Sequence, residues 1–204
     1  MALQKKMFAW LLSGDGPLRK KIAPYQQISS GTLAGKEVLE IGAGSGANIP
    51  YYISTKSVVL LEPNTYSHFY LREKVEQSKI PNAKIEEGIA ERLPFNDDSF
   101  DVVVTNLVLC SVQDVTQSLS EIKRVLRPGG QYIFLEHVAA EEGWAKGLQR
   151  LIRPVWLKVA DGCDCRRNLL KDLQNAEFTE LTAKSVYKVS TFVFKPILVG
   201  TARK

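Results

Sequence analysis

The sequence predicts an α/β fold built on a doubly wound, mostly parallel sheet. A short apolar strand at residues 38–41 runs into a turn with glycine at alternate positions, Gly42, Gly44 and Gly46. Residues 58–61 form a fully apolar run, as expected of a parallel strand that is buried on both faces. Strand-like and helix-like segments then alternate along the chain, and this order places helices on both faces of a parallel sheet.

Length and composition are those of one globular domain. The chain has 204 residues, 45% of them hydrophobic, which is enough for a sizeable core. No apolar run reaches the roughly 18 residues that cross a bilayer, and the N-terminus does not resemble a signal peptide. The 3 cysteines are too few for a disulfide framework. We therefore expect a single domain over residues 1–204, in the cytoplasm, with solvated lysines behind its net charge of +5.

The glycine turn is the first candidate binding site. Its glycines allow positive φ angles and let a ligand approach the main chain. Glu40 stands two residues before the turn. Because a carboxylate there would repel a pyrophosphate and attract a cation, the pattern favours a cationic ligand over a dinucleotide. A helix is expected to start at residues 47–52 and to present Asn48 to the ligand.

An acid at the end of the second strand is the next candidate. Glu62 lies 20 residues after Gly42, the spacing at which a carboxylate accepts hydrogen bonds from ribose hydroxyls. Pro63 and Asn64 follow, where the chain must turn past an adenine ring. Glu62 could instead only cap the next helix, expected at 65–77, but the glycine turn favours the ribose role.

The third and fourth strands are expected at residues 83–87 and 100–105. The fourth strand ends at Asn106 and Leu107. The switch point of a doubly wound sheet lies between its first and fourth strands. Asn106 and Leu107 should therefore line the same crevice as the glycine turn.

An amphipathic helix and a fifth strand follow. The helix is expected at residues 114–126 and stops at the sequence R-P-G-G, residues 127–130, because proline cannot continue a helix and glycine suits its end. The strand is expected at 132–135. His137 comes shortly after it, at the edge of the sheet where the ligand is expected.

Five ordered stretches together resemble the motifs of class I S-adenosylmethionine-dependent methyltransferases of the methyltransferase type 11 kind. They are E-x-G-x-G-x-G at 40–46, Glu62, G-I-A-E-R-L-P-F at 88–95, the strand at 100–107 and L-R-P-G-G at 126–130. This resemblance implies a Rossmann-like sheet of seven strands in the order 3-2-1-4-5-7-6, with strand 7 antiparallel. It also implies S-adenosyl-L-methionine as the cofactor and S-adenosyl-L-homocysteine as the product.

The resemblance assigns a role to residues of each motif. Glu40 would lie near the cationic methionine moiety and Glu62 on the ribose. The family commonly has an acid where this chain has Ile89, so we expect Ile89 to pack on the adenine ring and the backbone around Ala90 to contact its edge. The full predicted cofactor set is Glu40, Gly42, Ala43, Gly44, Gly46, Asn48, Glu62, Pro63, Asn64, Ile89, Ala90, Glu91, Asn106 and Leu107.

Four shorter strings narrow the resemblance to small bacterial relatives of the methyltransferase-like alkyl-thiol methyltransferases. They are G-S-G-A-N-I-P-Y-Y at 44–52, L-V-L-C-S-V at 107–112, L-E-H-V at 135–138 and D-G-C at 161–163. A small, lipophilic acceptor is implied, with a thiol as the first candidate. His137 is then the candidate catalytic base, since a neutral imidazole can accept the proton of a thiol with a pKa of about 8.5. The alternative is that His137 only hydrogen-bonds a loop.

The acceptor stays open at this point. A phospholipid-headgroup N-methyltransferase, a quinone-type C- or O-methyltransferase and a non-catalytic cofactor-binding subunit remain as alternatives. Glu40 and the glycine spacing argue against an NAD-dependent oxidoreductase. The sequence has no Asn-Pro-Pro-Tyr motif, so we expect a small-molecule acceptor and no nucleic-acid partner.

Two segments lie outside the core motifs. Residues 1–36 are predicted to form a helical cap or lid that carries Trp10 and Tyr25, or a surface that touches anionic membrane. Residues 138–165 are predicted as an insertion on the substrate side. It should contain a helix at 144–159, broken at Pro154.

The predicted acceptor-site residues are Cys110, Trp156 and Asp161. Cys163 and Cys165 lie one residue apart, but no paired Cys/His cluster stands near them in the sequence, so no metal is expected. A helix at 166–175 and two strands at 186–194 and 196–202 are expected to complete the chain. These strands should form an antiparallel hairpin at the edge of the sheet.

Overall fold

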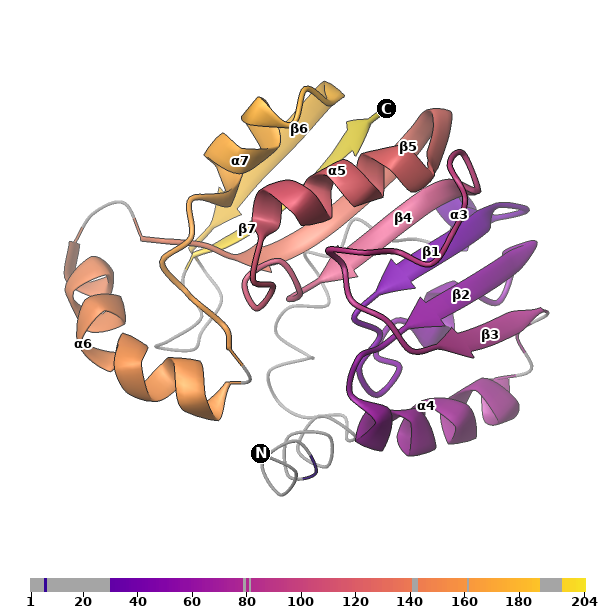
Figure 1. Cartoon of the computed structure of the whole chain (residues 1–204), viewed down its shortest axis with the longest axis horizontal. Coiled ribbons are helices and arrows are strands. Elements are labelled where there is room, and N and C mark those ends of the chain that lie inside the picture. Colours follow the sequence, from indigo (N-terminus) through magenta and orange to yellow (C-terminus); the bar gives the residue numbers. More distant parts are fainter. Residues whose placement is uncertain are drawn as a thin grey trace.

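A computed structural model describes residues 6, 30–78, 80, 82–140, 143–160, 162–187 and 196–204. They form a seven-stranded sheet in the predicted order, β3-β2-β1-β4-β5-β7-β6, with helices on both faces (Figure 1). The strands are β1 (Glu37–Ile41), β2 (Ser57–Leu61), β3 (Ala83–Glu86), β4 (Phe100–Asn106), β5 (Leu126–His137), β6 (Thr179–Val186) and β7 (Ile197–Arg203).

The strand directions also agree with the prediction. β1 pairs in parallel with both β2 and β4, and the parallel pairing continues to β3 on one side and to β5 on the other. β7 pairs antiparallel with β5 and with β6. From β1 the chain continues to β2 on one side of β1, and β4 later pairs with β1 on the opposite side. The carboxyl ends of β1 and β4 therefore flank the switch point, where doubly wound sheets bind ligands.

Successive side chains of each strand supply the cores on the two faces of the sheet. Leu39 and Val103 pack on the face covered by helices α5 (Val115–Val125) and α7 (Leu169–Asn175). Their neighbours Val38, Val102 and Val104 pack on the other face, with Leu33 of α3 (Ser30–Leu33) and Leu71 of α4 (Thr65–Ser78). The continuous apolar runs in β2 and β4 are explained by burial on both faces.

The connection between β1 and β2 differs from the prediction. In place of a helix at 47–52 it contains a single 3-10 turn, η2 (Ile49–Tyr51), with a proline at the start of the turn. Few residues remain between the glycine turn and β2, and Pro50 cannot donate a backbone hydrogen bond to a longer helix. Tyr52, fully buried, follows the turn and fills the space beneath it.

The R-P-G-G segment lies within a strand. α5 ends at Val125, and β5 starts at the next residue and continues to His137, so His137 is the last residue of the strand instead of following it. The pairing with β4 shifts register between Phe100 and Val102, and Gly129 has a φ of +74° there. A bulge of this kind accommodates the extra residues without ending the strand.

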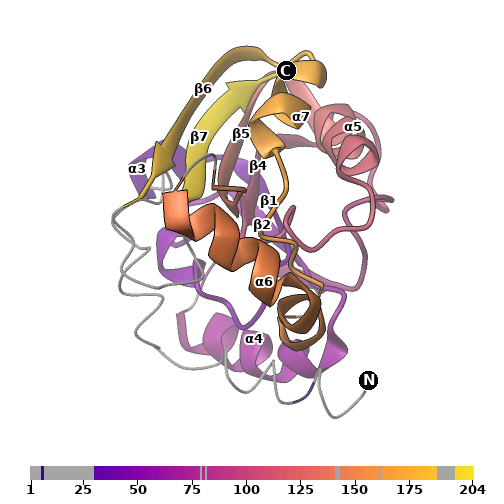
Figure 2. The same cartoon turned by 90° about the vertical axis from the view of Figure 1, so that its left-hand side faces the viewer.

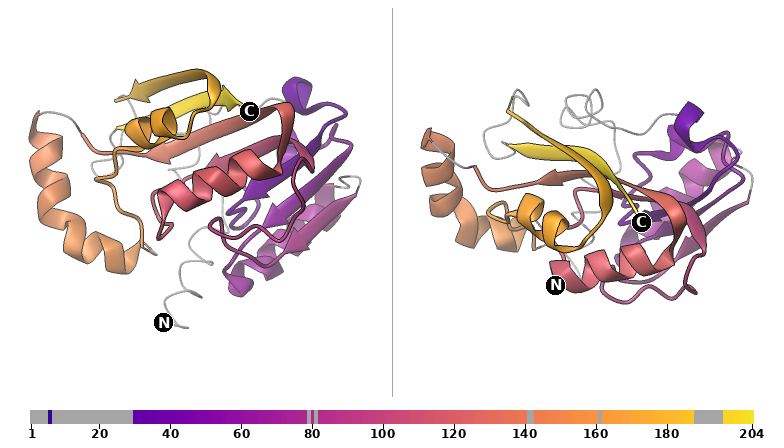
Figure 3. Two further views of the ribbon diagram at one scale, coloured as in Figure 1. Left: turned by 45° about the horizontal axis from the view of Figure 1, so that its top comes forward. Right: turned by 90° about the horizontal axis from the view of Figure 1, so that it is seen from above.

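Helix α6 (Gly143–Val159) continues through Pro154 instead of breaking there. Pro154 and Arg150 are both exposed, so water can bind the Arg150 carbonyl that loses its helical partner. The helix changes direction along its length (Figure 2). It stands off from the carboxyl end of β5 (Figure 3), where the predicted acceptor side is.

The C-terminal elements begin at other residues than predicted. α7 starts at Leu169 and not at 166, because the side chain of Asn168 accepts a hydrogen bond from the Lys171 N–H and caps the helix. β6 covers Thr179–Val186 and therefore begins earlier than the strand predicted at 186–194, of which residues 188–194 lie outside the described residues. As a half-exposed edge strand, β6 alternates exposed and partly buried side chains and lacks an apolar run.

Several predictions fall outside the described residues. They are the lid residues Trp10 and Tyr25, and Asp161. Of the N-terminal segment before α3 only Lys6 is described, and its ammonium lies 5.7 Å from the ring centre of Tyr66 on α4. Among the helices that the structure describes, none combines the length and the apolar character needed to cross a bilayer.

Candidate cofactor and acceptor site

The three glycines of the turn serve two different purposes. All three have positive φ angles, +67° at Gly42, +55° at Gly44 and +81° at Gly46. A Cβ atom at Gly42 would lie 2.4 Å from Cγ2 of Val108, and one at Gly46 would lie 2.5 Å from Cδ1 of Ile49. A Cβ atom at Gly44 would meet nothing within 4 Å. Packing therefore requires Gly42 and Gly46, whereas Gly44 faces open space that a ligand can occupy.

Glu62 ties the glycine turn to the end of β2. Its buried carboxylate accepts hydrogen bonds of 2.8 Å from the backbone N–H of Gly44 and of 2.8 Å from that of Asn64. A carboxylate can accept more than two hydrogen bonds. Glu62, which is predicted to bind the ribose, thus lies directly beside the open face of Gly44 and also holds the turn in place.

A chain of polar side chains crosses the switch point. Asn48 donates a hydrogen bond of 2.6 Å to Glu40, and Asn106 donates one of 3.3 Å to the side-chain oxygen of Asn48. The side-chain oxygen of Asn106 is buried and has no hydrogen-bond partner among the described residues. An unsatisfied buried acceptor costs about 1–3 kcal/mol. A buried carboxylate and an unsatisfied acceptor therefore fit a cationic donor such as the ammonium group of the expected cofactor.

The end of β4 has an unusual backbone. Leu107 has a φ of +60°, which is rare for a residue with a branched side chain, and its N–H donates a hydrogen bond of 2.7 Å to Leu135. Strained residues of this kind concentrate at functional sites. The turn sends the following residues, up to Cys110, across the carboxyl end of β5.

Glu136 fixes this loop to β5. Its carboxylate is fully buried and accepts hydrogen bonds from the N–H groups of Val108, at 3.1 Å, and Cys110, at 3.4 Å. Burial raises the pKa of Glu136 to about 7, although these hydrogen bonds oppose the increase. The sequence did not lead us to Glu136, although an acid inside an apolar strand is a recognisable signal.

Cys110, His137 and Cys163 meet at this point and form a buried cluster. The two Sγ atoms and one ring nitrogen of His137 all lie within 4.8 Å of one another. The Nδ1 atom of His137 is 3.3 Å from Sγ of Cys163. The Cys110 thiol and the His137 ring lower the pKa of Cys163, against the effect of burial, while the hydrogen bond with Cys163 and burial raise that of Cys110. Ionisation is therefore favoured at Cys163 and disfavoured at Cys110.

The turn after α6 brings Cys163 to the cluster. The N–H of Asp164 donates a hydrogen bond of 2.7 Å to the carbonyl of Cys110, and the Asp164 carboxylate forms a 2.7 Å ion pair with Arg153. Trp156 packs against this group of residues. Of the predicted acceptor residues, Cys110 and Trp156 therefore lie together, and His137 lies with them.

The remaining predicted cofactor residues occupy different environments. Ile89 is 51% exposed, which leaves its side chain available to an adenine ring, and Ala90 is buried. The carboxylate of Glu91 accepts a 2.6 Å hydrogen bond from the N–H of Gln113, so its contact is with the start of α5. Pro63 is exposed beside the end of β2.

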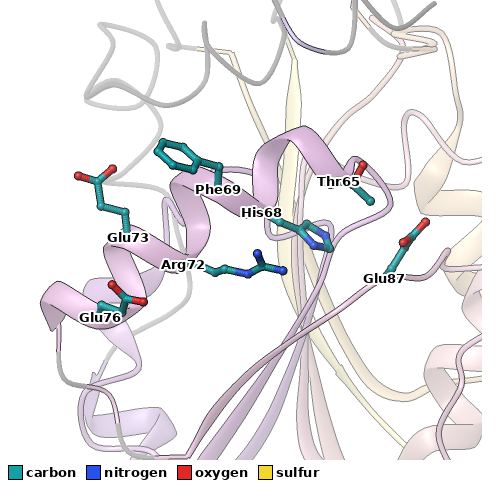
Figure 4. A pocket seen from close by; sticks show the side chains of 7 residues that line it. All are labelled: Thr65, His68, Phe69, Arg72, Glu73, Glu76 and Glu87. Carbon is teal, nitrogen blue, oxygen red and sulfur yellow. The ribbon is translucent and has the colours of Figure 1, made fainter.

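A separate hollow of about 690 Å³ lies beside α4 (Figure 4). Its volume would suit a small ligand. It contains three carboxylates, and none of the residues that line it is among those predicted to bind the cofactor. Because residues of the glycine turn and of the ends of β1 and β4 do not line the hollow, we place the cofactor at the turn. The residues that line the hollow are Thr65, His68, Phe69, Arg72, Glu73, Glu76 and Glu87.

The cluster of Cys110, His137 and Cys163 was not predicted from the spacing of cysteine and histidine residues along the sequence. The expectation that no metal is bound considered only residues near Cys163 and Cys165 along the chain. The structure instead brings Cys163 to Cys110 and His137, which come from distant segments. A signal was present, because the strings L-V-L-C-S-V, L-E-H-V and D-G-C each contribute one member of the cluster.

Comparisons with known proteins identify the family and the fold of this chain. Residues 39–134 match a family model described as a methyltransferase domain. The chain is 38% identical to the human thiol S-methyltransferase TMT1B, over 79% of this chain and 68% of the relative. It is 35% identical to human thiol S-methyltransferase TMT1A, over 91% of this chain and 78% of the relative. The crystal structure of a methyltransferase from Aquifex aeolicus matches with a TM-score of 0.64 at 16% identity, over 97% of each chain, which shows the shared fold.

Proposed function

This chain belongs to the methyltransferase domain family and is an S-adenosylmethionine-dependent methyltransferase, and we propose that it methylates the sulfur of a small, lipophilic thiol. The names of the two human relatives support a thiol acceptor. The Cys110–His137–Cys163 cluster supports it independently. It places two thiols and an imidazole at the carboxyl edge of the sheet, where we expect the acceptor to bind.

We assign the cofactor to the crevice at the carboxyl ends of β1, β2 and β4. Glu40 and the unsatisfied oxygen of Asn106 would hold its ammonium group. Glu62 would accept hydrogen bonds from the ribose, and the exposed Ile89 side chain would pack on the adenine. When bound, S-adenosylmethionine supplies an electrophilic methyl group, so the residues of the protein need only align and ionise the acceptor.

Ionisation of the acceptor is the chemical task of the other side of the site. Thiolate is the reactive nucleophile, and an ordinary thiol is mostly protonated at neutral pH. We assign His137 to promoting the loss of this proton, because it ends β5 beside the loop that follows β4. Trp156 and Ala160 would provide an apolar surface for a lipophilic chain. Exclusion of water there favours a thiol over a charged amine.

The observation that carries this proposal is the burial of Cys110, His137 and Cys163 together at the carboxyl ends of β4 and β5. The direct test is a panel of acceptors that includes an alkyl thiol, an alkyl amine, a phenol and phosphatidylethanolamine vesicles. We expect S-adenosylhomocysteine release and a methyl thioether with the thiol. Faster release with the amine or with the vesicles would overturn the thiol assignment and favour N-methylation.

A further inference from the structure

We propose that Cys110, His137 and Cys163 bind one Zn²⁺ ion and leave its fourth coordination position open for the thiol acceptor. The role of the open position rests on the proposed thiol acceptor. The metal site itself rests only on residues of this chain.

The spacing of the three side chains suits a single tetrahedral ion. Zinc lies about 2.3 Å from a cysteine sulfur and about 2.0–2.1 Å from a histidine nitrogen, so tetrahedral angles separate sulfur from nitrogen by about 3.6 Å and two sulfurs by about 3.8 Å. His137 Nδ1 and Cys163 Sγ are 3.3 Å apart, and all three ligand atoms lie within 4.8 Å of one another. Small side-chain movements would therefore bring all three into coordination.

The chemistry of the ligands selects zinc. Thiolates and imidazole together favour zinc over the hard cations that prefer oxygen. Two thiolates balance the charge of the ion, so the buried site would carry no net charge. Three protein ligands with one open position are the arrangement of catalytic zinc, whereas structural zinc has four. Asp164 does not complete the set, because its carboxylate is paired with Arg153.

The protein already holds the ligands in place. The loop that carries Cys110 is fixed by hydrogen bonds from its N–H to Glu136 and from the Asp164 N–H to its carbonyl. The backbone N–H of Cys163 donates a hydrogen bond of 3.0 Å to the carbonyl of Ala160. His137 is the last residue of β5 and pairs with Ile197 of β7. Because these side chains need little rearrangement, little of the free energy of metal binding is spent on ordering them.

The open position explains how a neutral thiol becomes a nucleophile. Coordination replaces the S–H bond with an S–Zn bond and releases one proton to solvent. The sulfur electron pair then forms the new S–C bond, and the bond between the methyl carbon and the sulfonium breaks toward the sulfonium sulfur. Zinc keeps its oxidation state. The thioether product carries no charge on sulfur and binds zinc weakly, so it can leave.

The first test measures metal directly. Full-length protein from zinc-supplemented cells, dialysed against metal-free buffer, should contain about one zinc per chain by elemental mass spectrometry. Cys110→Ser, His137→Ala and Cys163→Ser should each retain at least tenfold less. Cys165→Ser is the matched control, because Cys165 is equally buried but lies outside the cluster, and it should retain the wild-type amount.

The second test identifies the ligands in the wild-type protein. Replacement of zinc by Co²⁺ should produce the thiolate-to-cobalt charge-transfer absorption of a tetrahedral site. Wild-type protein that binds S-adenosylmethionine but takes up neither metal would overturn the site, as would a Cys110–Cys163 disulfide found in protein kept under reducing conditions. An equal loss of zinc in Cys165→Ser would place the metal elsewhere and would also overturn it.

The two proposals fail in different ways. Zinc bound by the cluster together with no methylation of any thiol would overturn the thiol acceptor and leave the metal site standing. Thiol methylation at an undiminished rate after complete removal of zinc would leave the proposed function standing and overturn the role of the open position.

Discussion

The imidazole Nδ1 of His137 lies 3.3 Å from Sγ of Cys163, although the two residues are 26 positions apart in the sequence. One ends a central strand of the sheet and the other follows α6, which stands off from it (Figure 3). Such a contact forms only when the segment with α6 folds back onto the carboxyl edge of the sheet. The segment predicted as a substrate-side insertion therefore contributes directly to the site.

Gly44 should be required by the ligand and not by the fold. Gly44→Leu should abolish binding of S-adenosylmethionine in calorimetry, because the side chain would enter the open space above the turn. Gly35→Leu is the matched control, since Gly35 also has a positive φ, +68°, and a Cβ atom added there would meet nothing within 4 Å. Each leucine should lower the free energy of unfolding by about 1–2 kcal/mol, the cost of a left-handed side-chain residue. Normal cofactor binding by Gly44→Leu would contradict the proposed site.

Glu62 should contribute to cofactor affinity both directly and by holding Gly44. Glu62→Ala should weaken binding by about 1–3 kcal/mol, the scale for loss of a buried, charge-assisted hydrogen bond. Titration calorimetry measures the change. Glu86→Ala removes an exposed acid from the end of the neighbouring strand and should have no effect. Unchanged affinity in Glu62→Ala would remove Glu62 from the site.

Arg127 should stabilise the opposite edge of the sheet without affecting the cofactor. It forms ion pairs with Glu37 of β1 and with Asp101 of β4, the latter at 2.8 Å. Arg127 and Lys56 lower the pKa of Glu37; for Asp101, burial raises the pKa, but the Glu37 N–H and Arg127 outweigh it and lower it. Arg127→Met should therefore cost about 1 kcal/mol of unfolding free energy at pH 7, after solvent screening.

The pH dependence of this effect has a definite sign. Carboxylates with a lowered pKa in the folded state stabilise it above their unfolded pKa of about 4, and this contribution disappears as the pH falls through the folded value. Urea unfolding should show the difference between wild type and Arg127→Met at pH 7 and its decrease as the pH falls below about 4. A difference that stayed constant as the pH falls below about 4 would show that Arg127 acts through packing.

The strands around the switch point could be predicted because a strand that is buried on both faces has a continuous apolar run in its sequence, as at residues 58–61 within β2. The glycine turn could be predicted because its sequence is distinctive. β6 was misplaced because an edge strand needs no such run. The turn at Ile49–Tyr51 was misread because the short connection to β2 and Pro50, which cannot donate a backbone hydrogen bond, together prevent a longer helix. The cluster of Cys110, His137 and Cys163 depends on tertiary contacts, which spacing along the chain does not reveal.

His137 should act on the acceptor and not on the cofactor. His137→Ala should reduce thiol methylation by about 10²–10⁴-fold, the range for loss of assisted proton transfer, while leaving the affinity for S-adenosylmethionine almost unchanged. The remaining activity should rise toward alkaline pH, where an alkyl thiol ionises without help. Steady-state rates from pH 6 to 10, with calorimetry of the cofactor, measure both effects.

An aryl thiol provides the sharpest control for this prediction. It is already largely ionised at neutral pH, so His137→Ala should lose much less activity with an aryl thiol than with an alkyl thiol. A purely structural role for His137 would instead reduce both rates equally and leave both pH profiles unchanged. Equal losses would therefore remove His137 from acceptor ionisation, whether it acts as a base or as a zinc ligand. The thiol assignment would then depend on the human relatives alone.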